Sequence, residues 1–292
     1  MIWGMGSTAK HQDTAADTRP IGLIAGQGRL PVLVAQGIRQ AGRQVACVGL
    51  NDQYAPELPG LCDRFACAGI IQLGRWIRLL RRWGVQDAVM IGRVRKARMY
   101  EPMRLLRQRP DWRAIKLWYR VLRHDKRNAA LLKSVADELA KGGIELIDST
   151  THIQSLVAPQ GVMTHHQPTG QQLADIEFGW PLALQTAELD IGQAIAVRER
   201  EVIAVEAIEG TNAMIRRAGA LCPIGRWTLI KTARADHDMR FDVPTIGPDT
   251  IDNLHQHGAS CLVVQSGRVI LADKTQLLAL ADRWGIAVVG RP

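Results

Sequence analysis

The chain passes repeatedly from a short apolar strand through a turn into a helix and back to a strand. Residues 21–25 and 45–50 have the continuous apolar character of buried strands, and residues 33–40 between them have helical apolar spacing. A basic amphipathic helix, "GRWIRLLRRWG", then precedes a further apolar strand at 87–91. Strands that alternate with helices of ordinary length favour a parallel sheet. We therefore predict an α/β fold that begins with a doubly wound domain.

A second set of elements follows a loop-rich stretch at residues 151–170. "LADIEFGWPLALQTAELD" has helical spacing, and "QAIAVREREVIAVEAI" and "ASCLVVQSGRVILA" each have the pattern of two strands joined by a turn, which predicts two hairpins. This mixture of hairpins and helices predicts a mixed α/β (α+β) domain. The predicted organisation is a polar N-terminal tail at 1–19, an N-terminal Rossmann-like domain at 20–150, a linker at 151–170 and a C-terminal domain at 171–292.

No segment of the sequence has the character of a secretory signal or a membrane span. Residues 1–20 are polar and mixed in charge, and no apolar run is long enough to cross a bilayer. The five cysteines are scattered and stand mostly within apolar runs, which is typical of free thiols in a reducing compartment. We therefore expect a soluble, cytoplasmic protein without disulfides.

Positive charge is concentrated in one segment. The chain carries a net charge of +9, and residues 93–127 alone contain 13 Lys and Arg against 3 acidic residues. Trp112, Trp118 and Tyr119 stand among these cations. Basic residues interleaved with Trp suit an anionic membrane surface or an anionic amphiphile, although helices with one solvated basic face have the same composition. Because no recognised nucleic-acid-binding motif occurs, we expect no nucleic acid partner.

The turn in "GLIAGQGRLP" lies between the first strand and the first helix. Gly26 and Gly28 leave room for backbone N–H groups to approach a phosphate at the helix N-terminus. The dinucleotide-binding fingerprint requires a third glycine, and Pro31 stands near that position. The turn therefore fits either a phosphate site or ordinary turn chemistry, and it argues against an NAD-dependent oxidoreductase.

The stretch "VEAIEGTNAMIRRAG" reads as a β-branched strand, a polar turn and a helix. Thr211 or Asn212 at the helix start would cap free backbone N–H groups, and the same N–H groups can bind an anion. The stretch alone leaves both interpretations open.

The stretch "KTARADHDMRFDVPTIG" gathers three cations and three aspartates directly after a predicted strand. Asp242 is followed by Val-Pro and then by a Thr-Ile-Gly turn that leads into a helix. A carboxylate at this position could bind a divalent cation or orient a water, and the neighbouring Lys and Arg residues could neutralise phosphate oxygens. A charged surface loop would have the same composition. The sequence has neither a Gly-x-Ser-x-Gly elbow nor a P-loop, so serine catalysis and ATP hydrolysis have no support.

Together these stretches resemble the UDP-2,3-diacylglucosamine pyrophosphatases of the LpxI type, which act in lipid A biosynthesis. The resemblance rests on "GLIAGQGRLP", "LDIGQAIAV", "VIAVEAIEGTNAM" and "KTARADHDMRFDVPTIG" in that order, and it extends from Pro20 over nearly the whole chain. It implies two domains with the substrate held between them, the second domain being catalytic. It also implies a divalent metal, Mg²⁺, and hydrolysis of a UDP-linked diacylated glucosamine to UMP and the lipid sugar phosphate.

The resemblance assigns the essential aspartate to Asp242, which directly precedes the apolar-Pro-Thr-Ile-Gly turn. Asp242 would be catalytic and, with Asp190, would ligate the metal. The basic, Trp-rich segment would contact the inner membrane surface or shelter the acyl chains, and we expect a homodimer. The predicted substrate-binding residues lie on turns of both domains: Gly26, Gln27, Gly28, Gly92, Arg93, Gln193, Glu209, Gly210, Thr211, Asn212, Lys231, Arg240, Thr245 and Gly247.

Two places depart from the family pattern. Asn212 stands where an aspartate is usual, and Arg127, Asn128 and Ala129 stand where relatives have Gly-Asp-Asp. Asn212 can still coordinate a cation through its amide oxygen, but it supplies no charge, so metal affinity should fall if that acid is a ligand. Three functions remain compatible with the sequence: the pyrophosphatase, a related hydrolase with an altered substrate, and a non-catalytic protein that binds a UDP-lipid.

Overall fold

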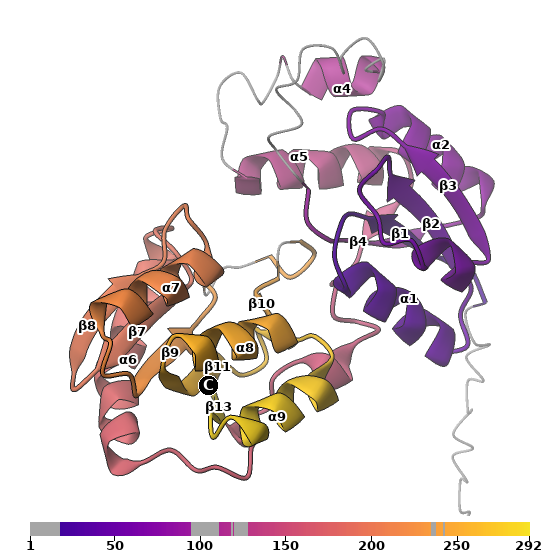
Figure 1. Cartoon of the computed structure of the whole chain (residues 1–292). Helices are drawn as coiled ribbons and strands as arrows, with labels where there is room; N and C mark the ends of the chain where they lie inside the picture. Colours follow the sequence, from indigo (N-terminus) through magenta and orange to yellow (C-terminus); the bar gives the residue numbers. More distant parts are fainter. Residues whose placement is uncertain (1–17, 95–110, 118, 120–127, 235–237, 242) are drawn as a thin grey trace, which may run out of the picture.

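The computed structural model describes residues 18–94, 111–117, 119, 128–234, 238–241 and 243–292. Figure 1 shows two α/β units, the first built from the N-terminal part of the chain and the second from the C-terminal part. Asp242, which was predicted to be catalytic, and most of the basic segment at 93–127 lie outside the described residues. None of the described helices is both long enough and apolar enough to span a membrane.

The first unit contains a five-stranded parallel sheet. Its strands are β1 (Ile21–Ala25), β2 (Val45–Leu50), β3 (Arg64–Ala68), β4 (Asp87–Ile91) and β5 (Glu145–Leu146). They have the order β3-β2-β1-β4-β5. The chain moves outward from β1 to β3 and then crosses to β4 on the other side of β1, which creates a topological switch point between β1 and β4. The predicted doubly wound, Rossmann-like fold is confirmed.

Helices cover both faces of this sheet. The described helical elements are α1 (Leu30–Gln40), the 3₁₀ helix η1 (Leu58–Leu61), α2 (Leu73–Arg82), α4 (Trp112–Leu117) and α5 (Asn128–Lys141). Alternate residues of β1 enter separate cores: Leu23 packs in the core that contains α1, and Ile24 packs in the core that contains α2 and α5. Burial on both faces explains the continuous apolar runs. Helix α1 begins earlier than predicted because Pro31 occupies its first turn, where a missing N–H breaks no helical hydrogen bond.

The second unit contains a mixed six-stranded sheet of order β6-β13-β11-β9-β7-β8. Helix α6 packs on one face through Ile176 and Trp180, and helices α7 to α9 pack on the other. The mixed α/β prediction for this part of the chain is therefore confirmed. The strands are β6 (Gly161–Val162), β7 (Ala194–Arg198), β8 (Glu201–Val205), β9 (Trp227–Lys231), β11 (Ala259–Gln265) and β13 (Ala287–Arg291). The helices are α6 (Gly170–Glu188), α7 (Thr211–Leu221), α8 (Pro248–Gln256) and α9 (Lys274–Arg283).

One of the two predicted hairpins forms. Strands β7 and β8 are antiparallel and are joined by Glu199 and Arg200, whose φ angles of 52° and 61° are typical of a type I′ turn. The hairpin predicted for "ASCLVVQSGRVILA" is wrong. Strand β11 lies between β9 and β13, so both of its edges are already hydrogen-bonded. The following strand β12 (Ile270–Leu271) instead pairs in parallel with β10 (Thr245–Ile246).

The segment predicted as a linker, residues 151–170, contains two short elements. The 3₁₀ helix η4 (Gln154–Leu156) is followed by β6, which pairs in antiparallel fashion with β13 and so belongs to the second sheet. All five cysteines are free, as expected. Burial raises the pKa of the Cys261 thiol to about 12, so this side chain is an uncharged part of the core at neutral pH.

The connection between β9 and β10 reaches from the second unit to the first (Figure 1). Phe241 packs in the core of α2 and α5, and Val243 packs in the core of α1. Ser149 holds the same connection by two hydrogen bonds, from its N–H to the Met239 carbonyl at 3.0 Å and from its hydroxyl to the Arg240 carbonyl at 2.9 Å. The residues on either side of Asp242 are therefore anchored on the first unit.

Candidate functional site

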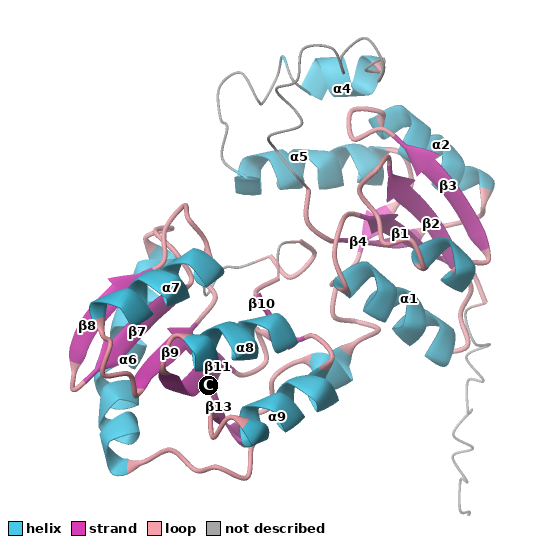
Figure 2. Ribbon diagram, in the orientation of Figure 1, coloured by secondary structure: helices cyan, strands magenta, loops and turns pink. Residues whose placement is uncertain are grey.

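The strand register of the second sheet brings three chain segments to one edge. Lys231 ends β9 and lies opposite Ala194, the first residue of the antiparallel strand β7. Val205 ends β8 and lies opposite Ile195. The carboxyl ends of β8 and β9 and the start of β7 therefore meet, and Figure 2 shows the three strands side by side. The N-terminus of α7 follows β8 at this same edge. Lys231 at the end of β9 therefore lies beside the start of α7.

A buried chain of polar side chains runs through this edge. The Lys231 ammonium donates to the Thr211 hydroxyl oxygen at 2.8 Å, and that hydroxyl donates to Glu206 Oε1 at 2.8 Å. Lys231 is 5% exposed and Glu206 is 9% exposed. Glu206 Oε2 is also buried, and within the described part of the chain it accepts no hydrogen bond. Buried polar atoms without partners are uncommon in folded proteins, so this oxygen requires an explanation.

The start of α7 carries no side-chain cap. Its N-cap residue is Gly210, which has a φ of 80° and makes no capping hydrogen bond, and the Thr211 hydroxyl is engaged with Glu206 instead. A φ in this range favours glycine. Asn212 is exposed, and its carbonyl accepts a hydrogen bond from Asn253 at 3.2 Å. Of the two interpretations of this turn, the side-chain cap is therefore wrong. The N–H of the third residue of α7 donates to the Gly210 carbonyl at 3.2 Å. Among the described residues, the backbone N–H groups of Thr211 and Asn212 have no hydrogen-bond acceptor, so they are available to an anion.

Glu209 is held apart from the buried chain by local contacts. Its carboxylate accepts hydrogen bonds from the Arg217 guanidinium at 2.5 Å and from the Ala207 N–H at 3.2 Å. Hydrogen bonds from its own backbone N–H and from Arg217 hold the pKa of the Glu209 carboxyl below its usual range. Glu209 is therefore a charged, partnered group of the turn, and the acid that contacts Thr211 is Glu206.

The loop that carries Asp190 and Gln193 packs directly against Glu206. A Cβ atom added at Gly192 would lie 2.0 Å from the Glu206 carbonyl oxygen, so only glycine allows this approach. The Gln193 carbonyl accepts the Thr232 N–H at 2.8 Å, which ties the loop to the end of β9. The Asp190 side chain is 71% exposed, and its Oδ1 lies 3.8 Å from the Arg234 guanidinium. The structure thus brings Gln193, Thr211 and Lys231 together, with Asp190 on the adjoining loop.

Gly26 and Gly92 lie where the turns after β1 and β4 meet. Gln27 and Arg93 exchange two backbone hydrogen bonds of 2.8 Å, and the Gly26 N–H donates to Ile91 at 2.9 Å. A Cβ at Gly26 would lie 2.8 Å from the Arg93 carbonyl, and one at Gly92 would lie 2.7 Å from the Gly26 carbonyl carbon. These glycines let the turns after β1 and β4 pack against each other. The N–H groups of Gly26 and Gln27 are engaged within the protein, so of the two interpretations of this turn these contacts favour ordinary turn chemistry.

Gly28 and the Arg93 side chain lie together at this switch point. Gly28 has a φ of 105°, and a Cβ built there would lie 3.8 Å from Arg93 Nε. Ligands of open α/β sheets bind outside the carboxyl ends of the strands at such a point. The Arg93 guanidinium is thus the group of this turn that is best suited to an anion.

The remaining predicted residues lie on the connection between β9 and α8. Arg240 donates to both carboxylate oxygens of Asp238, at distances from 2.6 to 3.1 Å, and this contact raises the pKa of Arg240. The Thr245 hydroxyl donates to the Val243 carbonyl at 2.9 Å, and Gly247 is the extended N-cap residue of α8. Arg240 is therefore a cation that a neighbouring carboxylate already holds in place.

Sequence reasoning missed Glu206. The signal was present, because this acid directly follows the β-branched residues of β8, whereas Glu209 lies in the polar turn. Among the described residues, no group of three or more His, Cys, Asp and Glu side chains is arranged to hold a metal.

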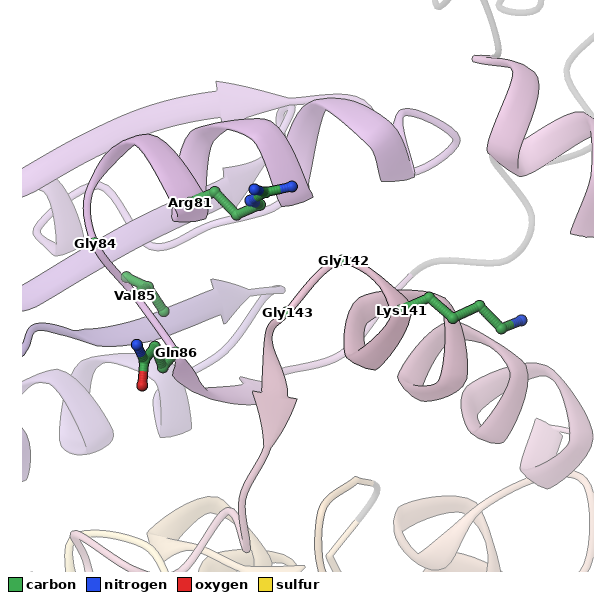
Figure 3. A pocket seen from close by; sticks show the side chains of 7 residues that line it. All are labelled: Arg81, Gly84, Val85, Gln86, Lys141, Gly142 and Gly143. Atoms are coloured by element: carbon green, nitrogen blue, oxygen red, sulfur yellow. The ribbon is translucent and has the colours of Figure 1, made fainter.

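Two surface cavities of the described residues lie away from this edge. One, of about 480 Å³, is lined by the ends of α2 and α5, including Gly84, Gly142 and Gly143 (Figure 3). Gly84 and Gly143 both have a φ of 78° and terminate these helices, so the hollow is a consequence of two helix ends meeting. The other, of about 450 Å³, lies between α2 and Trp112. The candidate site at Lys231 is therefore identified by its polar groups, and neither of these cavities contains it.

Comparison with known proteins gives consistent results over both units. The model of the LpxI N-terminal domain matches residues 20–156, and the model of the LpxI C-terminal domain matches residues 159–289. A protein of Caulobacter vibrioides (strain ATCC 19089 / CIP 103742 / CB 15) named UDP-2,3-diacylglucosamine pyrophosphatase LpxI is 33% identical over 282 residues. The aligned region covers 93% of this chain and 97% of that relative.

Proposed function

The chain belongs to the LpxI family, and on this premise we propose that it is a hydrolase that cleaves the pyrophosphate bond of UDP-2,3-diacylglucosamine. The products would be UMP and 2,3-diacylglucosamine 1-phosphate. The observation that carries the proposal is the buried Lys231 beside the uncapped start of α7, in a chain that both family models match. A pyrophosphate needs positive charge and N–H donors at the same place, and this edge supplies both.

The chemistry of the site follows from these groups. Attack by water on a phosphorus increases the negative charge on the phosphoryl oxygens, so donors fixed in advance stabilise the transition state. Lys231 and the first turn of α7 would face these oxygens, with the Arg93 guanidinium as a further cation from the first unit. Asp242, outside the described residues, would accept a proton from the water or ligate a metal. Its neighbours Phe241 and Val243 are anchored on the first unit, which supports a reacting centre between the units.

We further propose that Mg²⁺ takes part, held by Asp190, Asp242 and substrate oxygens. Mg²⁺ usually keeps several waters and binds through one or two carboxylates together with substrate phosphates. The exposed Asp190 carboxylate on the loop beside Glu206 fits this pattern, although its 3.8 Å contact with Arg234 would have to give way. When bound, the ion would neutralise phosphate oxygens and lower the pKa of a bound water.

Release of UMP from UDP-2,3-diacylglucosamine tests the proposal. We expect turnover by the wild-type protein that is lost on addition of EDTA, is restored by Mg²⁺, and falls roughly 10²–10⁴-fold in Asp242→Ala, the range for a positioned acid–base group. Asp249→Ala is the matched control, since Asp249 is an exposed acid in the first turn of α8. Wild-type protein that binds the lipid without releasing UMP would instead identify a UDP-lipid binding protein.

We also propose that the first unit contacts the membrane through a surface that we call the α2–α4 surface. It comprises Arg75, Arg78, Arg81, Arg82 and Lys116, all exposed, together with the exposed aromatic residues Trp112 and Tyr119. Asp111 joins the two helices, because its carboxylate accepts N–H groups from Gly74 in α2 and from Ala114 in α4. Cations around exposed aromatic rings suit an anionic lipid surface.

Vesicle binding tests this surface. We expect the double variant Arg78→Glu, Trp112→Ser to bind phosphatidylglycerol vesicles roughly tenfold or more weakly than wild type, since each cation near an anionic bilayer contributes about 1 kcal/mol. The control is Arg216→Glu, Leu221→Ser, which changes an exposed arginine and an exposed apolar residue of α7. Equal losses in the two double variants would show that the α2–α4 surface has no special role.

A further inference from the structure

The buried polar chain has a fixed direction. A threonine hydroxyl carries one proton, and Thr211 donates it to Glu206 Oε1, so a lone pair of the same oxygen accepts from the Lys231 ammonium. Glu206 thereby sets the orientation of the Thr211 hydroxyl, and the hydroxyl sets the position of Lys231 Nζ. Glu206 also supplies a negative charge two hydrogen bonds away from a cation that is 5% exposed.

A purely structural role explains Glu206 poorly. A carboxylate that served packing alone would have both oxygens satisfied, yet Oε2 is buried and accepts no hydrogen bond from the described residues. Leaving a buried acceptor without a partner is costly, and an apolar side chain would avoid the cost. The acid at this position is therefore better explained by its effect on its neighbours.

We propose that Glu206 is a positioning residue, which acts through Thr211 to hold the Lys231 ammonium at the start of α7, where it faces the substrate's pyrophosphate. This inference rests on the proposed function, because it assumes that Lys231 meets phosphate oxygens. It adds a residue that touches no substrate and determines the position of the Lys231 ammonium.

The test compares Glu206→Gln, Thr211→Val, Thr211→Ser and the double variant Glu206→Gln, Thr211→Val. We expect Glu206→Gln to lower kcat/KM by roughly 10-fold to 100-fold and to move the alkaline limb of the pH profile to lower pH, because removing a nearby negative charge makes an ammonium lose its proton more readily. Thr211→Val should lower kcat/KM similarly, and Thr211→Ser should retain most of it. The kcat/KM of the double variant should be no lower than that of the poorer single variant, since both substitutions break the same buried polar chain.

Glu201→Gln is the matched control, because Glu201 is an exposed acid at the start of the same strand, β8. Thermal unfolding of each variant separates a misplaced Lys231 from an unfolded domain. A folded Glu206→Gln protein with a wild-type pH profile, or strictly multiplicative losses in the double variant, would overturn the proposal.

Binding of UDP, measured by calorimetry, separates this proposal from the proposed function. If the wild-type protein binds UDP but releases no UMP from the lipid, the hydrolase proposal fails. The positioning proposal then predicts an affinity for UDP that is roughly tenfold weaker in Glu206→Gln and unchanged in Glu201→Gln. Equal affinities of wild type and Glu206→Gln would overturn it.

Discussion

Replacement of Lys231 with methionine is expected to lower kcat/KM for the UDP-lipid by roughly 10²–10³-fold, the loss seen when one preorganised donor to a developing anion is removed. Methionine keeps the length and volume of the side chain but removes the ammonium that donates to Thr211 at 2.8 Å. Because Lys231 is only 5% exposed, little water can reach this position to stabilise the phosphate oxygens in place of the ammonium. Steady-state rates of UMP release, with kcat and KM determined separately, measure the effect.

Two further variants give this prediction its controls. Lys231→Arg keeps the charge on a longer, forked group, so we expect it to recover only part of the lost rate. Lys133→Met removes an exposed cation of α5 and should leave the rate unchanged. A folded Lys231→Met protein whose kcat/KM stays within threefold of wild type would mean that the phosphates bind elsewhere.

The substitution Gly192→Ala is expected to destabilise the second unit by roughly 2–4 kcal/mol, which lies at the upper end of single substitutions that force atoms into a packed region. The added Cβ would lie 2.0 Å from the Glu206 carbonyl oxygen and 2.6 Å from its carbonyl carbon. Both are backbone atoms, so no rotation of a side chain relieves the overlap. The loop that carries Asp190 and Gln193 must then move away from Glu206.

Thermal unfolding and UMP release together measure this effect. We expect the unfolding temperature to fall by roughly 5–15 °C, and activity to fall at temperatures where the variant is still folded. Gly170→Ala is the control, because a Cβ at Gly170 meets no heavy atom within 4 Å and the residue begins α6. That variant should be as stable as wild type or slightly more stable. An unchanged unfolding temperature in Gly192→Ala would show that the loop does not depend on this approach.

The family resemblance and the local pattern together account for much of what the structure describes. The alternation of apolar strands and amphipathic helices predicts the doubly wound first unit, because strands buried on both faces read as continuous apolar runs. The hairpin of β7 and β8 follows from its two-residue turn. The motif that contains Asp242 is visible in the sequence alone, and its catalytic role stays a prediction because this residue lies outside the described part of the chain.

Other predictions fail where partners are distant in sequence. Strand β12 was predicted to pair with β11, but both edges of β11 are taken by β9 and β13, and no local pattern reveals which edges are free. The sequence left Gly26 open to a phosphate site or to ordinary turn chemistry, because it does not show that Gly26 packs against Gly92. A contact between two turns depends on the order of the strands in the sheet.

The sequence by itself determined the strand–helix order, the burial of the strands and the residue types at each strand end, since these depend on neighbours within a few positions. Only the tertiary structure decided that Glu206, Thr211 and Lys231 form one hydrogen-bonded chain. Thr211 and Lys231 are 20 residues apart, and they meet because β9 runs antiparallel to β7 and places its last residue beside the start of α7. Register between strands sets this contact, and register is a property of the whole sheet.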